Sequence, residues 1–150
     1  MKITFIHVGS KEPNRLCEKL SEKVINLVHT IYVLPAKVEI QFENMGPNVY
    51  GMTMLDPRFP NRIRLNQSLS LEEIVIPLTH ELIHLHQMYT NRLRYSTGGR
   101  IFWDKTVYKV DMLKMSYDEY QQLPWERDVI EKQEKLLKFL QQNNKKLKIK

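Results

Sequence analysis

Apolar and polar residues recur with two different periods along the chain, and these periods predict which segments are strands and which are helices. Residues 3–8 form a short apolar run that is typical of a strand. Residues 13–33 carry apolar side chains at the spacing of one helical face, which predicts a helix. Pro13 suits the first turn of this helix, and Pro35 prevents much continuation beyond it. The chain is therefore expected to begin with a strand followed by a long helix.

Three strand-like segments follow this helix. Residues 37–42 alternate between apolar and polar, which is the period of a half-buried strand. Residues 49–55 follow a turn at residues 44–48 and form the second segment. Arg62–Asn66 also alternates, and its basic positions are typical of an exposed edge strand, because charge resists aggregation there. Such an edge could hold an extended peptide substrate by backbone pairing, although a plain edge strand has the same pattern.

The C-terminal half is expected to contain two strands and one or two helices. Residues 100–103 and 106–110 have the pattern of short strands joined at Asp104 and Lys105. Residues 116–123 could form a short helix, and Pro124 is expected at the first position of a last helix that runs to about residue 142. We expect the basic tail at residues 143–150 to be frayed. Without an internal repeat or a linker, residues 1–150 are expected to form a single α+β domain.

Composition narrows the class of protein. With 150 residues, of which 42% are hydrophobic and 27% charged, the chain is typical of one globular domain. No apolar run approaches the roughly 20 residues that span a bilayer, and the N-terminus lacks the pattern of a signal peptide. The single cysteine, Cys17, cannot form an internal disulfide. These features predict a protein of a reducing cytoplasm, in the producing cell or in a host, without membrane contact.

The net charge of +6 permits contact with nucleic acid or with an acidic partner. Part of this charge lies in the basic tail, which is expected to be solvated. Because no nucleic-acid-binding motif accompanies the charge, a nucleic-acid partner is not expected. We expect a monomer.

The run His80-Glu81-Leu82-Ile83-His84 carries the candidate chemistry. On a helix, residues four apart lie on one face, so both imidazoles can hold one Zn²⁺. Glu81 would then lie beside the metal, where it could take a proton from a zinc-bound water. Short runs of this kind also arise by chance, but here apolar residues surround the run on nearly every side of the helix. Buried imidazoles need partners, and a metal would satisfy both.

The start of this helix has two signals. Ser70 and Glu73 have the spacing of a capping box, which marks a helix N-terminus. Pro77 lies inside the helical pattern and removes a backbone donor. We therefore expect a kink or a fresh helix start just before the histidines.

A catalytic zinc site needs a third protein ligand. One known arrangement has a third histidine six residues after the second motif histidine, with a glycine between them. It is excluded here, because Gln87 and Thr90 occupy those positions, and His86 points away from His84. Among the downstream acids, Glu126 falls on the apolar stripe of the last helix, whereas Asp128 points roughly away from it. A carboxylate on a buried face must be paired or bound to a metal, so Glu126 is the expected third ligand. The alternative is a first-turn glutamate that the helix dipole stabilises.

Two segments resemble a known family. The strand-turn-strand at residues 102–108 and the segment Leu123-Pro124-Trp125-Glu126-Arg127-Asp128, taken with the His-Glu-x-x-His run, resemble small metallopeptidases of tailed bacteriophages. These belong to the zincin superfamily, gluzincin type, and the resemblance covers about residues 70–133.

The resemblance implies zinc as cofactor, with ligands His80, His84 and Glu126 and with Glu81 as general base. It also implies a minimal zincin fold, in which a small, mostly antiparallel sheet packs on an N-terminal helix, the active-site helix and a C-terminal helix that carries the third ligand. One departure is Ile130, where thermolysin-like enzymes have an aspartate.

The expected function is that of a zinc-dependent metalloendopeptidase, in which Glu81 passes a proton from the attacking water to the leaving amine. An oxyanion donor is also needed, and the sequence does not choose among Tyr95, Tyr108, Tyr117 and Tyr120. Two alternatives stay open. One is a catalytically silent zinc-binding protein that acts through a partner, and the other is a protease or regulator of nucleic-acid-associated proteins.

Overall fold

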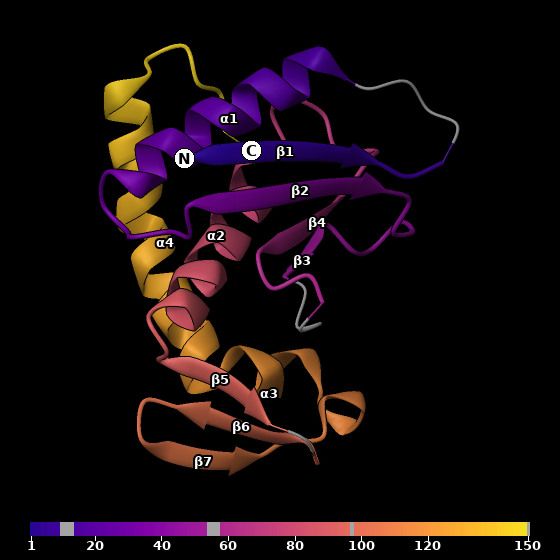
Figure 1. The fold of residues 1–150 in the computed structure, drawn as a ribbon, viewed down its shortest axis with the longest axis vertical. Coiled ribbons are helices and arrows are strands. Elements are labelled where there is room, and N and C mark those ends of the chain that lie inside the picture. The colour runs from indigo at the N-terminus through magenta and orange to yellow at the C-terminus, as the bar shows by residue number, and fades with distance from the viewer. Residues whose placement is uncertain (10–13, 54–57, 97, 150) are drawn as a thin grey trace.

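The structure is a computed structural model that describes residues 1–9, 14–53, 58–96 and 98–149 (Figure 1). Helices and strands both contribute, so the α+β class is confirmed. In chain order the elements are β1 (Lys2–His7), α1 (Arg15–His29), β2 (Lys37–Glu43), β3 (Gly51–Thr53), β4 (Arg62–Asn66), α2 (Val75–Tyr89), β5 (Leu93–Ser96), β6 (Arg100–Trp103), β7 (Thr106–Lys109), the 3-10 turn η1 (Met112–Lys114), α3 (Tyr117–Gln121) and α4 (Pro124–Asn143).

The larger sheet has the strand order β1-β2-β4-β3, and its pairings are mixed. β1 pairs with β2 and β2 with β4 in parallel, whereas β3 pairs with β4 in antiparallel orientation. The prediction of a mostly antiparallel sheet on the N-terminal helix is therefore wrong. The physical reason is that α1 carries the chain back across the sheet after β1, so that β2 starts at the same end as β1.

Arg62–Asn66 is an interior strand, because β4 lies between β2 and β3. The prediction of an exposed edge strand is wrong there. Its basic side chains form ion pairs with the neighbouring strand β2: Arg62 Nε donates to Glu39 Oε2 at 2.8 Å, and Arg64 contacts Glu43. The edge is β3, which is shorter than the predicted strand at residues 49–55; residues 54–55 lie outside the described residues.

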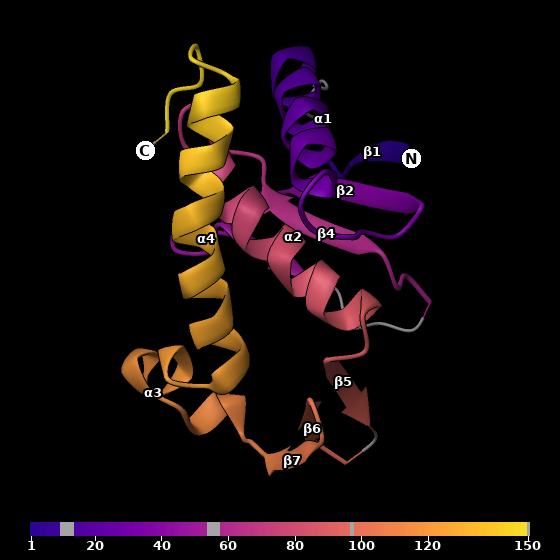
Figure 2. The ribbon, with the colours of Figure 1, turned by 90° about the vertical axis from the view of Figure 1, so that its left-hand side faces the viewer.

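The helices pack on the sheet through a single apolar cluster. α1 begins after Asn14, whose side-chain oxygen accepts from the backbone of Leu16 and Cys17, so it is shorter than predicted; Pro13 lies outside the described residues. α2 contacts both β3 and α4, and Figure 2 shows it crossing α4. These contacts explain why α2 is apolar nearly all round. Within the described ranges, no helix has the length and apolar character of a membrane span.

α2 starts at Val75, four residues later than the capping box alone would indicate. The capping box does form, since Ser70 Oγ accepts from Glu73 N and Glu73 Oε1 accepts from Ser70 N, but it closes a separate turn. Pro77 falls in the first turn of α2, where its missing N–H needs no partner. The expected fresh start before the histidines is confirmed.

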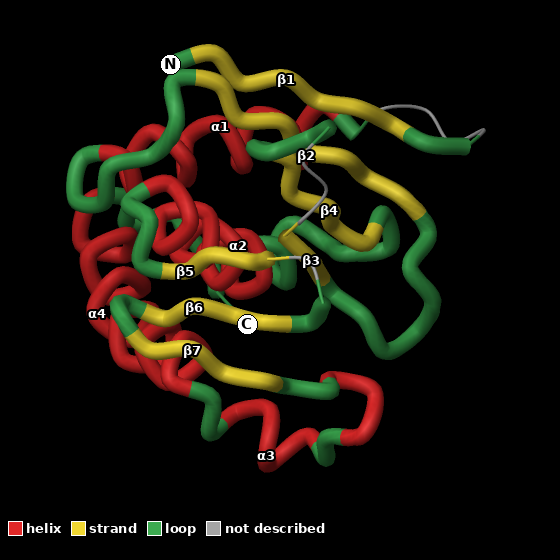
Figure 3. The backbone as a smooth tube through the Cα atoms, turned by 60° about the horizontal axis from the view of Figure 1, so that its bottom comes forward, coloured by secondary structure: helices red, strands yellow, loops and turns green. Residues whose placement is uncertain are grey.

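A second, small sheet follows α2. The strands β5, β6 and β7 are antiparallel and lie side by side in Figure 3. Their buried side chains Leu93, Ile101 and Trp103 form a separate apolar cluster with Leu123 and Trp125 at the start of α4. β5 was not predicted, because only its first residue is buried and its pattern is mostly polar.

The basic tail packs more than predicted. Leu147 is only 8% exposed and belongs to the main apolar cluster, and Ile149 packs against that cluster. The described tail residues are therefore not simply frayed, because two apolar side chains between the lysines turn toward the core.

Candidate metal centre

His80 and His84 lie one turn apart on α2 and present their rings to the same point. The ring centroids are 5.0 Å apart, with an interplanar angle of 73°. His84 is buried, whereas His80 is half-buried. The i, i+4 spacing therefore brings the two imidazoles together as the sequence predicted.

Glu126 reaches this point from the first turn of α4. Its Oε2 lies 3.2 Å from His80 Nε2, and its Oε1 lies 2.9 Å from His84 Nε2. The residue is only 3% exposed. One donor atom from each of the three residues lies within 4.8 Å of the others, so the group could hold one metal ion. Among the described residues, no other cluster of this kind occurs.

The charges in this cluster stabilise one another. Burial by itself would raise the pKa of Glu126, but hydrogen bonds with His80 and His84 hold that pKa far below its usual range. Burial would likewise lower the pKa of His84, but the Glu126 carboxylate outweighs burial and raises it. The Glu126 carboxylate and the His84 imidazole therefore each favour the charged form of the other.

Two of the four candidate tyrosines lie at this cluster. The Tyr120 hydroxyl donates to Glu126 Oε1 at 2.7 Å. Tyr95 lines the adjoining cavity, where burial, together with the charges of Glu126 and Glu81, raises its pKa to about 12. Tyr108 instead packs its ring on Trp125, and Tyr117 is 74% exposed.

Glu81 lies on α2 between the two histidines and faces the edge strand β3. The hydroxyl of Thr53 donates to its carboxylate Oε2 and also lies 3.3 Å from its backbone oxygen. Gly51 leaves room for the side chain, since a Cβ at this position would lie 3.2 Å from Glu81 Cγ and 3.1 Å from Leu65 Cδ2. No local pattern predicts the roles of Thr53 and Gly51, because both lie on a strand that is distant from Glu81 in sequence.

A cavity of about 380 Å³ adjoins the cluster and exposes Glu81, His84 and Glu126 to its interior. The remaining wall is largely apolar, and three methionines contribute to it. The apolar side chains of the wall are Met52, Met88, Leu93 and Met112. An extended molecule in this cavity would therefore meet one polar corner and an otherwise apolar surface.

Three other polar residues of α2 and α4 lie outside the cluster. His86 Nδ1 lies 2.8 Å from the backbone oxygen of Val33, so it faces away from the two histidines as predicted. Gln133 donates to Ile76 O at 2.7 Å and ties α4 to the start of α2. Asp128 does not contact the histidines directly, but it accepts from Gln87 at 2.8 Å.

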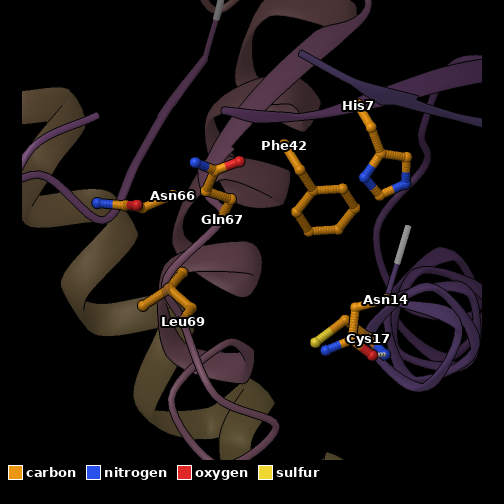
Figure 4. Close-up of a pocket in the computed structure, with 7 residues that line it drawn as sticks. All are labelled: His7, Asn14, Cys17, Phe42, Asn66, Gln67 and Leu69. Atoms are coloured by element: carbon orange, nitrogen blue, oxygen red, sulfur yellow. Dashed lines mark hydrogen bonds between the residues drawn. The ribbon is translucent and has the colours of Figure 1, made fainter. Parts of the chain in front are cut away.

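A second cavity, of about 190 Å³, lies between the N-terminus of α1 and the carboxyl ends of β1, β2 and β4 (Figure 4). His7 stacks on Phe42 with ring centroids 5.1 Å apart, and its Nε2 lies 3.0 Å from Glu18 Oε1. Cys17 also lines this cavity. A histidine and a thiol therefore line this cavity and a glutamate contacts the histidine, yet the three do not converge as a three-ligand cluster.

Comparison with known proteins adds no assignment. No family model, no curated protein and no solved structure matches the chain. What the protein does must therefore be inferred from the chemistry of its own residues.

Proposed function

We propose that the protein is a zinc-dependent metallopeptidase, with His80, His84 and Glu126 as metal ligands and Glu81 as general base. The observation that carries the proposal is the convergence of two imidazoles and a buried carboxylate beside a cavity that also exposes Glu81. Two nitrogens and one oxygen are a donor set of catalytic zinc sites, which keep a further position open. Tetrahedral zinc with bonds of about 2.0–2.1 Å separates its ligand atoms by about 3.3 Å. The two imidazole nitrogens lie 2.9 and 3.2 Å from different oxygens of Glu126, so small adjustments would bring the three ligands around one ion.

The residues around the cluster have distinct roles in this proposal. Zinc bound there would lower the pKa of water toward about 7 and polarise a peptide carbonyl. Glu81 would accept the proton of the attacking water and return it to the leaving amine. The Thr53 hydroxyl would keep the Glu81 carboxylate directed to the cavity. Tyr120 would fix Glu126 through its hydrogen bond.

Tyr95 is the oxyanion donor that we favour. It lines the cavity, and its hydroxyl has no hydrogen-bond partner among the described residues, whereas the Tyr120 hydroxyl is engaged by Glu126. With a pKa of about 12, Tyr95 stays protonated at neutral pH and can donate. A donor directed at developing negative charge stabilises the transition state.

The substrate class follows from the cavity wall. Because the wall is largely apolar, we propose peptides with an apolar side chain next to the scissile bond. The edge strand β3, rather than β4, could hold the peptide backbone by strand addition.

The test is metal analysis combined with digestion of an unbiased peptide library. The proposal expects about one zinc per chain, cleavage that stops when a chelator removes the metal, and selection for apolar residues at the cleaved bond. A zinc-loaded protein that cleaves no peptide would refute the peptidase and favour a silent zinc-binding protein. A protein that binds no zinc would refute both.

A further inference from the structure

Gln87 lies one turn after His84 on α2 and is completely buried. Its side-chain oxygen Oε1 lies 2.9 Å from His84 Nδ1, the ring nitrogen that faces away from Glu126. A fully buried amide must satisfy its donors and its acceptor within the protein. The partners of Gln87 therefore determine which way it points.

The orientation of this amide is fixed by two acceptors. Gln87 Nε2 donates to the backbone oxygen of Trp125 at 3.0 Å and to Asp128 Oδ2 at 2.8 Å. Neither oxygen can donate in return, so the NH₂ group must face them and Oε1 must face His84. Because Oε1 can only accept, Nδ1 of His84 must carry a hydrogen. The other nitrogen, Nε2, is then the one available to a metal.

The two acceptors flank the carboxylate ligand. Trp125 directly precedes Glu126 in α4, and Asp128 follows two residues later. One amide thus contacts a histidine ligand on α2 and both sides of the glutamate ligand on α4. A shift of either helix would break at least one of its hydrogen bonds.

Asp128 extends this network to the small sheet. It accepts from Lys132 Nζ at 2.9 Å, and Arg92 Nη1 lies 3.5 Å away. Arg92 also donates to Asp104 at 2.9 Å, in the turn between β6 and β7, and its guanidinium lies over the Trp103 ring at 4.4 Å. The acceptor that orients Gln87 is therefore itself held on two sides.

We propose that Gln87 is a positioning residue of the metal centre, which sets the tautomer and ring orientation of His84 and holds the first turn of α4 so that Glu126 meets the same ion. This inference rests on the proposed metal site. Partners that orient metal-binding histidines from behind typically change metal affinity by about 10–100-fold when they are removed. Such an effect exceeds what a remote packing residue would produce.

The test compares two glutamines that join the same two helices, Gln87, which is buried, and Gln133, which is half-buried. Gln87→Met keeps the size of the side chain and removes all three of its hydrogen bonds. Gln133→Met is the matched control, because Gln133 also ties α4 to α2, through Ile76 O and Thr79 Oγ1, without contacting a ligand. Zinc affinity is measured by competition with a chromogenic chelator, the ligand field by the visible absorption of the Co²⁺-loaded protein, and stability by thermal unfolding of the metal-free protein.

We expect Gln87→Met to bind zinc about 10–100-fold more weakly and to alter the Co²⁺ absorption bands. Gln133→Met should lower the unfolding temperature while zinc affinity and the Co²⁺ bands stay as in the wild type. If the wild type binds zinc and Gln87→Met binds it equally well with the same bands, the positioning role is wrong while the metal site stands. If the wild type binds no zinc, the proposed function itself fails.

If Gln87→Met cannot be purified in a folded form, the zinc affinity of Asp128→Ala tests the positioning role instead. This side chain is partly exposed, and its loss leaves Gln87 Nε2 with only the Trp125 carbonyl. A smaller loss of zinc affinity in the same direction supports the proposal, and unchanged affinity overturns it.

Discussion

His7 and His84 each lie close to a glutamate oxygen, at 3.0 and 2.9 Å, and each lines a cavity, but their surroundings differ. Glu18, the partner of His7, also pairs with Arg15 at 3.5 Å, so a permanent cation shares its charge. Both His7 and Glu18 keep contact with solvent, with side chains 20% and 13% exposed. The contact of His7 with Glu18 is therefore half-buried, and water and Arg15 both share the charge of the glutamate.

The cluster at Glu126 differs in number and in burial. Two imidazoles and the Tyr120 hydroxyl converge on one carboxylate, and no lysine or arginine pairs with it in the described part of the chain. The side chain of Glu126 is 4% exposed. A histidine–glutamate contact alone therefore does not identify a metal site. The convergence of two imidazoles on one buried carboxylate is a stronger basis for our proposal of a metal site, because a carboxylate so deeply buried needs a positively charged partner.

The largest expected effect comes from removing the carboxylate ligand. Glu126→Gln should lose zinc affinity by more than the roughly 10–100-fold that outer partners cost, and peptide hydrolysis should fall with it. The matched variant Glu18→Gln should keep wild-type zinc binding, since it alters the other histidine contact. Competition with a chelator measures the zinc affinity of both variants. Equal zinc affinity in the two variants would remove the distinction between the clusters.

The next effect separates metal binding from chemistry. Glu81→Gln should keep zinc while its kcat for a cleaved peptide falls by about 10²–10⁴-fold, the range of general acid–base catalysis. Steady-state kinetics and metal analysis on the same sample check both parts. A variant that loses zinc would make Glu81 part of the ligand set instead.

A smaller effect is expected from the residue that orients Glu81. Thr53→Val keeps the shape of the side chain and removes the hydroxyl that donates to the carboxylate. The lost hydrogen bond to a charged group, of about 1.5–3 kcal/mol, should lower kcat by about tenfold or more without changing zinc affinity. Thr53→Ser, which retains the hydroxyl, is the control and should stay near wild type.

The metal-free protein should show a pH dependence that zinc abolishes. Because the pKa of His84 is raised in the folded protein, its contribution to the free energy of unfolding is complete below its unfolded pKa of about 6.5. This contribution is lost as the pH rises through the folded pKa. Because the folded pKa of Glu126 is lowered, its contribution is lost on the acid side of about pH 4.5. Thermal unfolding should therefore show highest metal-free stability between these limits. His84→Asn should remove the loss of stability at alkaline pH. Bound zinc should also remove this loss, because the metal takes the place of the imidazole proton.

The smallest effect is expected at the other histidine. His7→Gln should change the free energy of unfolding by about 1 kcal/mol, the typical net contribution of one hydrogen bond, and should leave zinc binding unchanged. Denaturant unfolding measures the free energy of unfolding, and chelator competition measures the zinc affinity. A loss of zinc in this variant would place a metal in the other cavity.

The sequence was sufficient for the residues whose relation is local. The spacing of His80 and His84 fixes their common helical face, and the buried stripe of α4 identified Glu126. The pairing of strands was not local. Arg62 and Arg64 suggested an exposed edge, but their partners Glu39 and Glu43 lie on a strand that becomes a neighbour only in the fold.

Gln87 shows the same limit within the site. In the sequence, Gln87 indicates only that this is not a zincin with a third histidine, and Asp128 points away from Glu126 on the helical wheel. In the structure these two residues contact each other, because α2 and α4 pack together. No local pattern records a hydrogen bond between helices, so residues that support a ligand are harder to predict than the ligand itself.

X-ray absorption at the zinc edge of the loaded protein tests the central claim most directly. We expect two imidazole ligands and oxygen ligands at about 2.0–2.1 Å, and the imidazole signal should be lost in a variant that lacks His80 and His84. A sulfur ligand at about 2.3 Å would instead place the ion at Cys17 in the other cavity. That result, or a protein that holds no zinc above background, would contradict the account.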